Sequence, residues 1–259
     1  MLTGRIVLDA RLAEAEPGPR YRGLDLLTGQ VLERVTRRGK FLVVPLLRNG
    51  ERLNDLIIHL GMTGVLSLVP PPRPQHLRVL LGLDGGLGLH FTDARRFGRF
   101  LLTPAGDHSS LPTLQAMGPE PLGEGFTAEA FATALARSVT AVKTYLLSQR
   151  PVAGVGNIYA DEALWRAGVN PATPARDVPA AQIGPLRDAI RAVLAESIAR
   201  EGTTFSDYRT VTGATGSFQD SLAVYGRAEQ PCGRCGHPIR RTVLGGRGTH
   251  HCPHCQPSL

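Results

Sequence analysis

Residues 232–255 read CGRCGHPIRRTVLGGRGTHHCPHC and contain all four cysteines of the chain. They form two CxxC pairs that are separated by sixteen residues: Cys232 with Cys235, and Cys252 with Cys255. This spacing is typical of a four-thiolate zinc site, in which each pair supplies two sulfurs of one tetrahedron. The stretch between the pairs predicts a small hairpin tipped by Gly245 and Gly246. A zinc ion with four protein ligands has no open position for water, so we expect one structural zinc.

Two disulfides are the alternative interpretation of the same four cysteines. The chain begins without a signal-peptide pattern and contains no cysteine outside this stretch, so an oxidising compartment is not indicated. Zinc hairpins usually contact nucleic acids or proteins. The rest of the chain must therefore indicate what this hairpin does.

The composition favours a nucleic-acid partner. The 259 residues carry a net charge of +7, with a pI of about 9.7, and 42% of them are hydrophobic. A basic chain with a zinc hairpin points to nucleic acid, although the charge could also serve solubility alone. Only Lys40 and Lys143 are lysines among the 29 basic residues. Because lysine can lose its proton and arginine cannot readily do so, we expect these two positions to need an amine.

The first part of the chain, residues 4 to 102, predicts an antiparallel β-sandwich or barrel. Short apolar segments alternate with Gly, Pro and Asn, as strands alternate with turns. The proline-rich run 70–74 cannot pair in a central strand, so we expect a surface loop there. The expected strands are residues 6–8, 41–47, 56–60, 77–83 and 87–102.

Helical patterns follow a segment at 104–126 that is rich in Pro, Gly and Ser. We expect helices from Thr127 to about Ser138, over 140–149 and over 157–167. A longer helix is expected from Asp177 as its N-cap to about 200, followed by a long loop. Its apolar stripe consists of Ile183, Leu186, Ile190, Val193, Leu194 and Ile198.

Several short motifs suit contacts with DNA. Residues 152–159 place a glycine turn directly before a helix, which can present backbone N–H groups and Asn157 to a phosphate; a plain helix–helix turn is the alternative. Residues 92–98, Thr-Asp-Ala-Arg-Arg-Phe-Gly, place two arginines beside an aromatic ring that could wedge into a base stack. A solvated turn with Phe97 in the core is the alternative. Met62, between Gly61 and Gly64, is either core packing or an exposed adaptable tip.

In this order the segments resemble the bacterial formamidopyrimidine-DNA glycosylase family over almost the whole chain. Each motif is weak alone, and the ordered set is specific. The related endonuclease VIII is the alternative within the superfamily, but Met62 and Arg95-Arg96-Phe97 resemble the formamidopyrimidine branch more closely. The resemblance rests on residues 37–41, 59–62, 92–98, 118–122, 154–161, 202–204 and 224–227 and on the four cysteines.

The resemblance implies a base-excision repair enzyme that removes 8-oxoguanine and formamidopyrimidines and then cuts the strand by β/δ-elimination at the abasic site. The target nucleotide has to leave the base stack. Met62, Arg95 and Phe97 would fill the vacated space, with Arg95 facing the orphaned cytosine. Asn157 would hold a flanking phosphate. Further implied roles are phosphate binding and proton donation by Lys40 and Arg247, DNA binding by His76 and Lys143, and a lid over the damaged base at 203–218.

The beginning of the chain departs from the family pattern. The family begins Met-Pro-Glu-Leu-Pro-Glu, and the proline amine exposed after methionine removal attacks the sugar. This chain begins Met1-Leu2-Thr3, which resembles a later part of the family sequence. Two interpretations stay open: Met1 is an internal residue of a longer normal enzyme, or the chain is a truncated paralogue that binds lesions or abasic DNA without excising. A weak lyase activity through Lys40 is a further possibility.

We therefore predict an α+β multidomain protein with a β-sandwich at 1–110, a linker at 111–126, a helix-two-turns-helix domain at 127–228 and a zinc finger at 229–259. The expected partner is duplex DNA with an oxidised purine or an abasic site. We expect a monomer in the bacterial cytoplasm, associated with the nucleoid, and no membrane contact. An RNA-associated zinc-ribbon protein would explain the cysteines and the charge but not Met62, Arg95 and Phe97.

Overall fold

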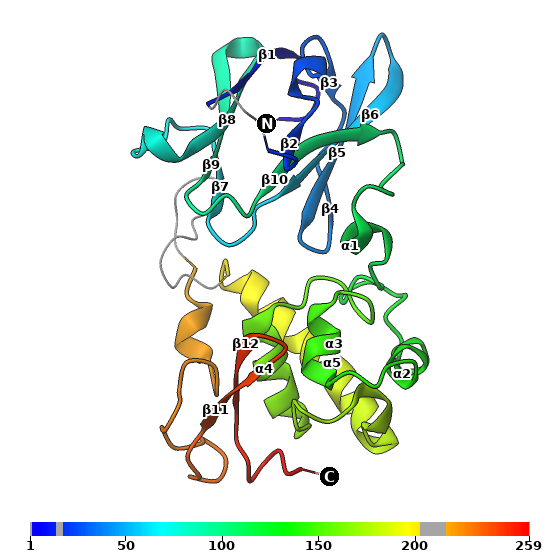
Figure 1. Cartoon of the computed structure of the whole chain (residues 1–259), viewed down its shortest axis with the longest axis vertical. Coiled ribbons are helices and arrows are strands. Elements are labelled where there is room, and N and C mark those ends of the chain that lie inside the picture. Colours follow the sequence, from blue (N-terminus) through cyan, green and yellow to red (C-terminus); the bar gives the residue numbers. More distant parts are fainter. Residues whose placement is uncertain (1, 14–17, 203–215, 259) are drawn as a thin grey trace. The chain divides into compact units, whose positions relative to one another are not determined.

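A computed structural model describes residues 2–13, 18–202 and 216–258 of the chain (Figure 1). The described residues fall into two compact units. The first consists mainly of residues 2–115, and the second of residues 116–202 together with 217–258. Each unit has its own core and is described by itself.

The first unit is a β-sandwich of two sheets. The four-stranded sheet has the order β1 (Val7–Leu12), β8 (Leu77–Leu83), β9 (Leu87–Asp93) and β7 (Gly64–Ser67). The six-stranded sheet has the order β2 (Tyr21–Arg22), β10 (Arg99–Pro104), β6 (Glu51–His59), β5 (Phe41–Arg48) and β3 (Val31–Leu32), and β4 (Thr36–Arg38) also pairs with β5. Every named strand pair is antiparallel except β2 with β10, which is parallel. The short helices are η1 (Leu24–Leu26), η2 (Pro74–His76), η3 (Asp84–Gly86) and α1 (Pro112–Gln115).

The core of the sandwich lies between the two sheets. Leu81 and Phe91 of the four-stranded sheet are fully buried, as are Leu46 and Phe100 of the six-stranded sheet. The rings of Phe91 and Phe100 lie 5.7 Å apart between centroids and join the two layers. Alternating burial along β8 produces this arrangement, because successive side chains of a strand point to opposite faces.

Two turns carry the chain from one sheet to the other. Residues 60–63 join β6 to β7, and residues 94–98 join β9 to β10. The expected strand 87–102 is thus two strands in different sheets. The break follows from the turn at Arg96, whose φ of 58° lies in the left-handed region.

The second unit is helical and ends in a hairpin. Its core joins Phe131, Leu146, Leu164 and Leu186, one residue from each of its α-helices. Among the residues that the structure describes, no helix combines the length and the apolar character needed to cross a membrane. The helices are α2 (Ala128–Ala136), α3 (Val142–Leu147), α4 (Asn157–Ala167), η4 (Ala175–Asp177), α5 (Ala180–Ala199) and η5 (Phe218–Ser221).

The N-cap of α2 and both ends of α4 agree with the sequence, whereas α2 ends at Ala136 instead of near Ser138, α3 covers Val142–Leu147 instead of 140–149, and α5 starts later than expected. The Thr127 hydroxyl accepts from the backbone N–H of Ala130 at 3.1 Å, so the expected N-cap of α2 is confirmed. The helix α4 begins at Asn157 and ends at Ala167, as expected. Asp177 does not cap α5, which starts at Ala180. The reason is Pro179, which disfavours helical geometry in the residue before it.

The apolar stripe of α5 is shorter than expected. Leu186, Ile190 and Val193 are buried, whereas the side chain of Ile198 is exposed. The buried contact in the last turn of α5 comes instead from Ser197, whose hydroxyl bonds that of Tyr159 at 2.7 Å.

The zinc hairpin consists of β11 (Arg240–Leu244) and β12 (Arg247–His251), which lie beside α4 in Figure 1. Gly245 and Gly246 have φ of 55° and 74° and form the two-residue turn. Positive φ at both positions is the backbone of a type I′ turn, which suits the twist of a hairpin. A side chain at Gly245 would also lie 3.0 Å from Thr144, so the tip approaches α3 closely.

Candidate nucleic-acid interface and zinc site

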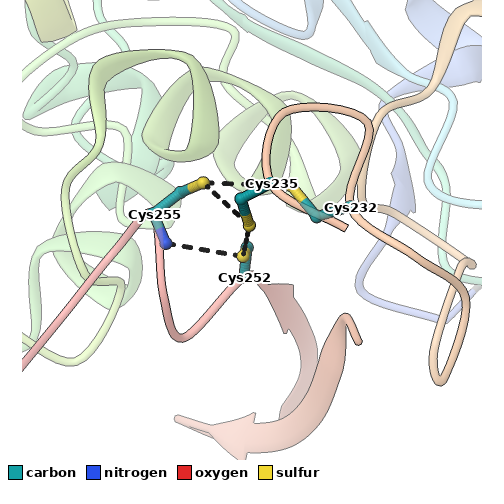
Figure 2. Close-up of side chains that lie close together, drawn as sticks. All are labelled: Cys232, Cys235, Cys252 and Cys255. Atoms are coloured by element: carbon teal, nitrogen blue, oxygen red, sulfur yellow. Dashed lines mark hydrogen bonds between the residues drawn. The ribbon is translucent and has the colours of Figure 1, made fainter. Parts of the chain in front are cut away.

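The four cysteines converge as the sequence predicts. Cys232 and Cys235 come from one loop, Cys252 and Cys255 from the end of the hairpin, and their side chains point toward one another (Figure 2). All four sulfurs lie within 4.8 Å of one another. Three of the pairs are 3.5 to 3.9 Å apart. A tetrahedron with Zn–S bonds of about 2.3 Å has edges of about 3.8 Å, so the four sulfurs fit one zinc ion.

The geometry of the four cysteines favours a metal site over disulfides. All four cysteines are free, and the sulfur separations are far longer than the S–S bond of about 2.05 Å. Against its burial, hydrogen bonds, first that of the Arg234 backbone N–H, lower the pKa of Cys232 to about 6. Burial and the neighbouring sulfurs raise the pKa of Cys252 and raise that of Cys255 to about 12, so metal binding has to release protons from the set. The thiolate is the form that binds metal. The structure therefore supports one structural zinc and excludes the disulfide alternative.

In the first unit, the two turns that link the sheets lie against each other. A side chain at Gly61 would lie 2.8 Å from the backbone of Phe97 and Gly98, so the turns pack without a gap. Asp93 is fully buried and ties them together. Its carboxylate accepts from the Thr63 hydroxyl and, at 2.6 Å, from the Gly98 N–H. The Arg95 N–H in turn donates to the Thr63 hydroxyl at 3.1 Å.

These turns expose the three residues that the sequence singled out. The side chains of Met62 and Phe97 are 53% and 43% exposed, and Arg95 is exposed beside them. The Arg95 guanidinium lies over the Phe97 ring at 4.9 Å, and that of Arg20 at 5.8 Å. The alternative that placed Phe97 in the core is therefore wrong, and of the two interpretations of Met62 the exposed tip is confirmed. We call Met62, Arg95 and Phe97 the sandwich tip.

Lys40 lies in the turn between β4 and β5 and is exposed. Its charge acts on His59, at the end of β6. Burial, together with the charges of Lys40 and Arg99, lowers the pKa of His59 to about 4, so the imidazole is neutral at pH 7. Its Nδ1 accepts from the Gly61 N–H at 3.0 Å, which leaves the proton on Nε2 as a hydrogen-bond donor. His59 stands in the motif 59–62, and its sequence pattern alone indicates no role for it.

His76 ends η2 and is half-buried just before β8. The proline-rich loop before it is mostly exposed, as expected.

In the second unit, a glycine turn leads into α4 at Asn157, whose helix start has no side-chain cap. Gln149 holds this turn: its amide nitrogen donates to the Val155 carbonyl at 2.7 Å, and its amide oxygen accepts from the Gly154 N–H at 2.8 Å. The Asn157 amide nitrogen donates to the Gly248 carbonyl of the hairpin at 3.0 Å. An amide nitrogen carries two hydrogens, so Asn157 can also reach a second acceptor.

Arg247 and Lys143 lie near the same hairpin in different environments. Arg247 begins β12 and is exposed. Lys143 is fully buried, with its Nζ 2.7 Å from Asp161 Oδ1. Burial lowers the pKa of Lys143, the Asp161 carboxylate opposes that shift, and the charge of Arg247 adds to it. A buried, paired ammonium does not suit the direct DNA contact that the resemblance implied for Lys143.

Two buried acids, Asp93 and Glu162, hold the backbone around these sites. Asp93 joins the two turns of the sandwich tip. Glu162 is fully buried in α4 and accepts three backbone N–H groups at 2.8 to 2.9 Å from Ala223, Val224 and Tyr225. Asp93 stands in the quoted motif 92–98 and Glu162 follows Asp161 in the helical pattern, but neither spacing indicates that the acid is buried. Most of the expected lid, residues 203–218, lies outside the described residues.

Comparison with family models gives three matches in chain order. Residues 3–100 match the formamidopyrimidine-DNA glycosylase N-terminal domain, and residues 117–209 match the formamidopyrimidine-DNA glycosylase H2TH domain. Residues 229–257 match a zinc finger found in FPG and IleRS.

Similar proteins carry the same name. Formamidopyrimidine-DNA glycosylases of Deinococcus radiodurans and Thermus thermophilus are each 47% identical to this chain, over 92% of it and 86% of the relative. The crystal structure of the MutM (Fpg) protein from Thermus thermophilus matches this chain with a TM-score of 0.89 and 43% identity. The match covers 100% of this chain and 94% of the Thermus thermophilus chain. A structure of MutM in complex with DNA containing carbocyclic 8-oxo-G matches this chain with a TM-score of 0.85 at 31% identity. That match covers 99% of this chain and 94% of the MutM chain.

Proposed function

This chain belongs to the formamidopyrimidine-DNA glycosylase family, and from that premise we propose that it repairs oxidised duplex DNA. It removes oxidised purines such as 8-oxoguanine and formamidopyrimidines and then cleaves the strand at the abasic site. Similar structures hold DNA with 8-oxo-G or an abasic site. Its partner is lesion-containing DNA, and its one zinc is structural.

The main structural support for this proposal is the sandwich tip. A base that leaves the stack has to be replaced, and an exposed thioether, guanidinium and phenyl ring on two tightly joined turns can replace it. Phe97 is the wedge, Met62 fills the gap, and Arg95 offers hydrogen bonds to the unpaired cytosine. The stacked Arg95 and Phe97 support each other in this role.

Three polar residues are proposed as phosphate contacts: Lys40 and Arg247, which are exposed cations, and Asn157 at the start of α4. For Lys40 and Arg247 we also propose proton donation during elimination. His76 is proposed as a further DNA contact. We place the enzyme on the bacterial chromosome in the cytoplasm, since its relatives are bacterial and DNA is its partner.

The test of activity is borohydride trapping on duplex DNA with 8-oxoguanine opposite cytosine. We expect a covalent protein–DNA adduct and strand cleavage. The 259-residue chain is compared with the same chain extended upstream by a complete N-terminal segment of the family, which begins Met-Pro-Glu-Leu-Pro-Glu and includes the first helix. Adducts from neither protein would overturn the glycosylase proposal, and tight binding without adducts would indicate a non-catalytic binder. A preference for oxidised pyrimidines over purines would indicate the endonuclease VIII type.

The role of the sandwich tip is tested by Phe97→Ala and Met62→Ala. Leu26→Ala is the matched control, because Leu26 is 54% exposed in the same unit and lies outside the tip. We expect both tip variants to bind abasic duplex and to excise 8-oxoguanine about tenfold more weakly, with thermal unfolding unchanged. Equal excision by the tip variants and the control would contradict the proposed wedge.

A further inference from the structure

The second unit contains a buried ion pair that the proposed chemistry does not use. Lys143 in α3 and Asp161 in α4 are both fully buried, and their charged atoms lie 2.7 Å apart. Replacing a buried ion pair by apolar residues is often neutral or stabilising, so such a pair is weak evidence for a role in stability. A geometric role is the better explanation.

The ammonium of Lys143 has a full set of partners. Besides Asp161, its Nζ donates to the Gly248 carbonyl and to the Thr249 hydroxyl, each at 2.8 Å. An ammonium has three hydrogens, and each has an acceptor here. Lys143 therefore binds the hairpin strand β12 and has no ammonium hydrogen left to donate to a phosphate.

Asp161 holds the next residue of the same strand. Its Oδ2 accepts from the backbone N–H of His250 at 2.9 Å. The ion pair thus contacts three consecutive residues of β12: Gly248, Thr249 and His250. Asn157 lies one helical turn before Asp161, on the same side of α4, and also donates to the Gly248 carbonyl.

The residues of β12 that these contacts hold directly follow Arg247 in the chain. The Gly248 carbonyl, which accepts from both Lys143 and Asn157, belongs to the residue that follows Arg247. The Thr249 hydroxyl, held by Lys143, donates to the Arg247 carbonyl at 3.1 Å. The backbone of Arg247 is therefore tied to α3 and α4, while its side chain is exposed.

We propose that Lys143 and Asp161 are positioning residues, which hold the hairpin so that Arg247 and Asn157 form a preformed pair of phosphate donors. This inference rests on the proposed function. Fixing the hairpin before DNA arrives removes the cost of ordering it on binding. It also corrects the direct DNA contact expected for Lys143.

The test uses the full zinc-loaded chain and a duplex with a tetrahydrofuran abasic analogue. Affinity is measured between about 50 and 300 mM salt for the wild type, Lys143→Met, Arg247→Ala and the double variant. Each phosphate contact contributes about 0.9 to the slope of log affinity against log salt. We expect Lys143→Met and Arg247→Ala each to lower that slope by about 1, and the double variant to lower it no further.

Arg166→Met is the matched control. It breaks the ion pair between Arg166 of α4 and Glu196 of α5, whose charged atoms lie 2.7 Å apart and do not contact β12. Its slope should equal that of the wild type. Zinc content and unfolding of each variant show whether the hairpin is intact. If Lys143→Met loses zinc, Lys143→Met/Asp161→Asn carries the test, because it leaves no unpaired buried charge.

An unchanged slope in a zinc-loaded Lys143 variant, or additive losses in the double variant, would overturn the positioning role. A purely structural role would lower the folded fraction and leave the slope unchanged. Failure of the proposed function can be told apart from failure of the positioning role. In that case the wild type itself would bind abasic and undamaged duplexes equally.

Discussion

Replacing Glu162 by glutamine is expected to destabilise the second unit strongly. The carboxylate is fully buried in α4. Its Oε1 accepts from Val224 and Tyr225, and its Oε2 from Ala223. Val224 packs in one cluster with Cys232 and Cys252, so these bonds hold the segment that leads into the zinc site.

The magnitude follows from the hydrogen bonds. Glutamine keeps one acceptor oxygen, so two bonds survive without the charge, and an NH₂ group then faces the N–H of Ala223. A hydrogen bond to a charged group contributes about 1.5–3 kcal/mol, and an orphaned buried donor costs about 1–3 kcal/mol. Glu162→Gln should therefore lower the free energy of unfolding by about 3–5 kcal/mol, a large part of the stability of a domain.

Urea unfolding followed by tryptophan fluorescence measures this loss. Trp165, the one tryptophan of the chain, lies in α4 under the guanidinium of Arg234 at 3.9 Å and therefore reports on this unit. Glu196→Gln is the control: Glu196 is half-exposed and paired with Arg166, so its loss should cost no more than about 1 kcal/mol. A Glu162→Gln loss below about 1 kcal/mol would refute the reasoning.

Three further predictions concern the zinc, a histidine and a glycine. Metal analysis should find one zinc per chain, and chelation should unfold the hairpin and weaken DNA binding; a chelated protein that binds as tightly as the zinc-loaded one would contradict this. His59 has a folded pKa of about 4 against an unfolded value of 6.5, so the unfolded state binds more protons between these values and stability is lost as the pH falls. Between about pH 7.5 and 5 that loss is about 2 kcal/mol in urea unfolding, and His59→Gln should lack it; an equal pH dependence in both proteins would count against this. Gly98→Ala should cost about 1–3 kcal/mol, because its Cβ would lie 2.6 Å from the Phe91 ring, whereas Gly18→Ala, with nothing within 4 Å, should be neutral in thermal unfolding.

Local signals in the sequence predicted much of this protein. The CxxC pairs, the Gly-Gly turn and the Thr127 cap each depend on residues close together in the chain, and the structure confirms the features they predict. The alternation of apolar strands and Gly or Pro turns likewise predicted the sandwich. The predicted N-cap of the long helix, Asp177, was wrong. Pro179 disfavours helical geometry in the residue before it, so the helix cannot begin next to Asp177.

Long-range contacts were decided only by the tertiary structure. The exposure of Phe97 was set by the tertiary structure, in which Gly61, far away in the sequence, packs against its backbone. Lys143 could be identified as an unusual amine, but its partners Asp161 and Gly248 come from other elements. By itself the sequence determined the zinc ligands, the fold class and the family resemblance, because these features depend on short spacings between residues and on the order of the motifs along the chain. Burial and pairing of single charges depend on which elements pack together, and that is why the structure alone separated the exposed Arg247 from the buried Lys143.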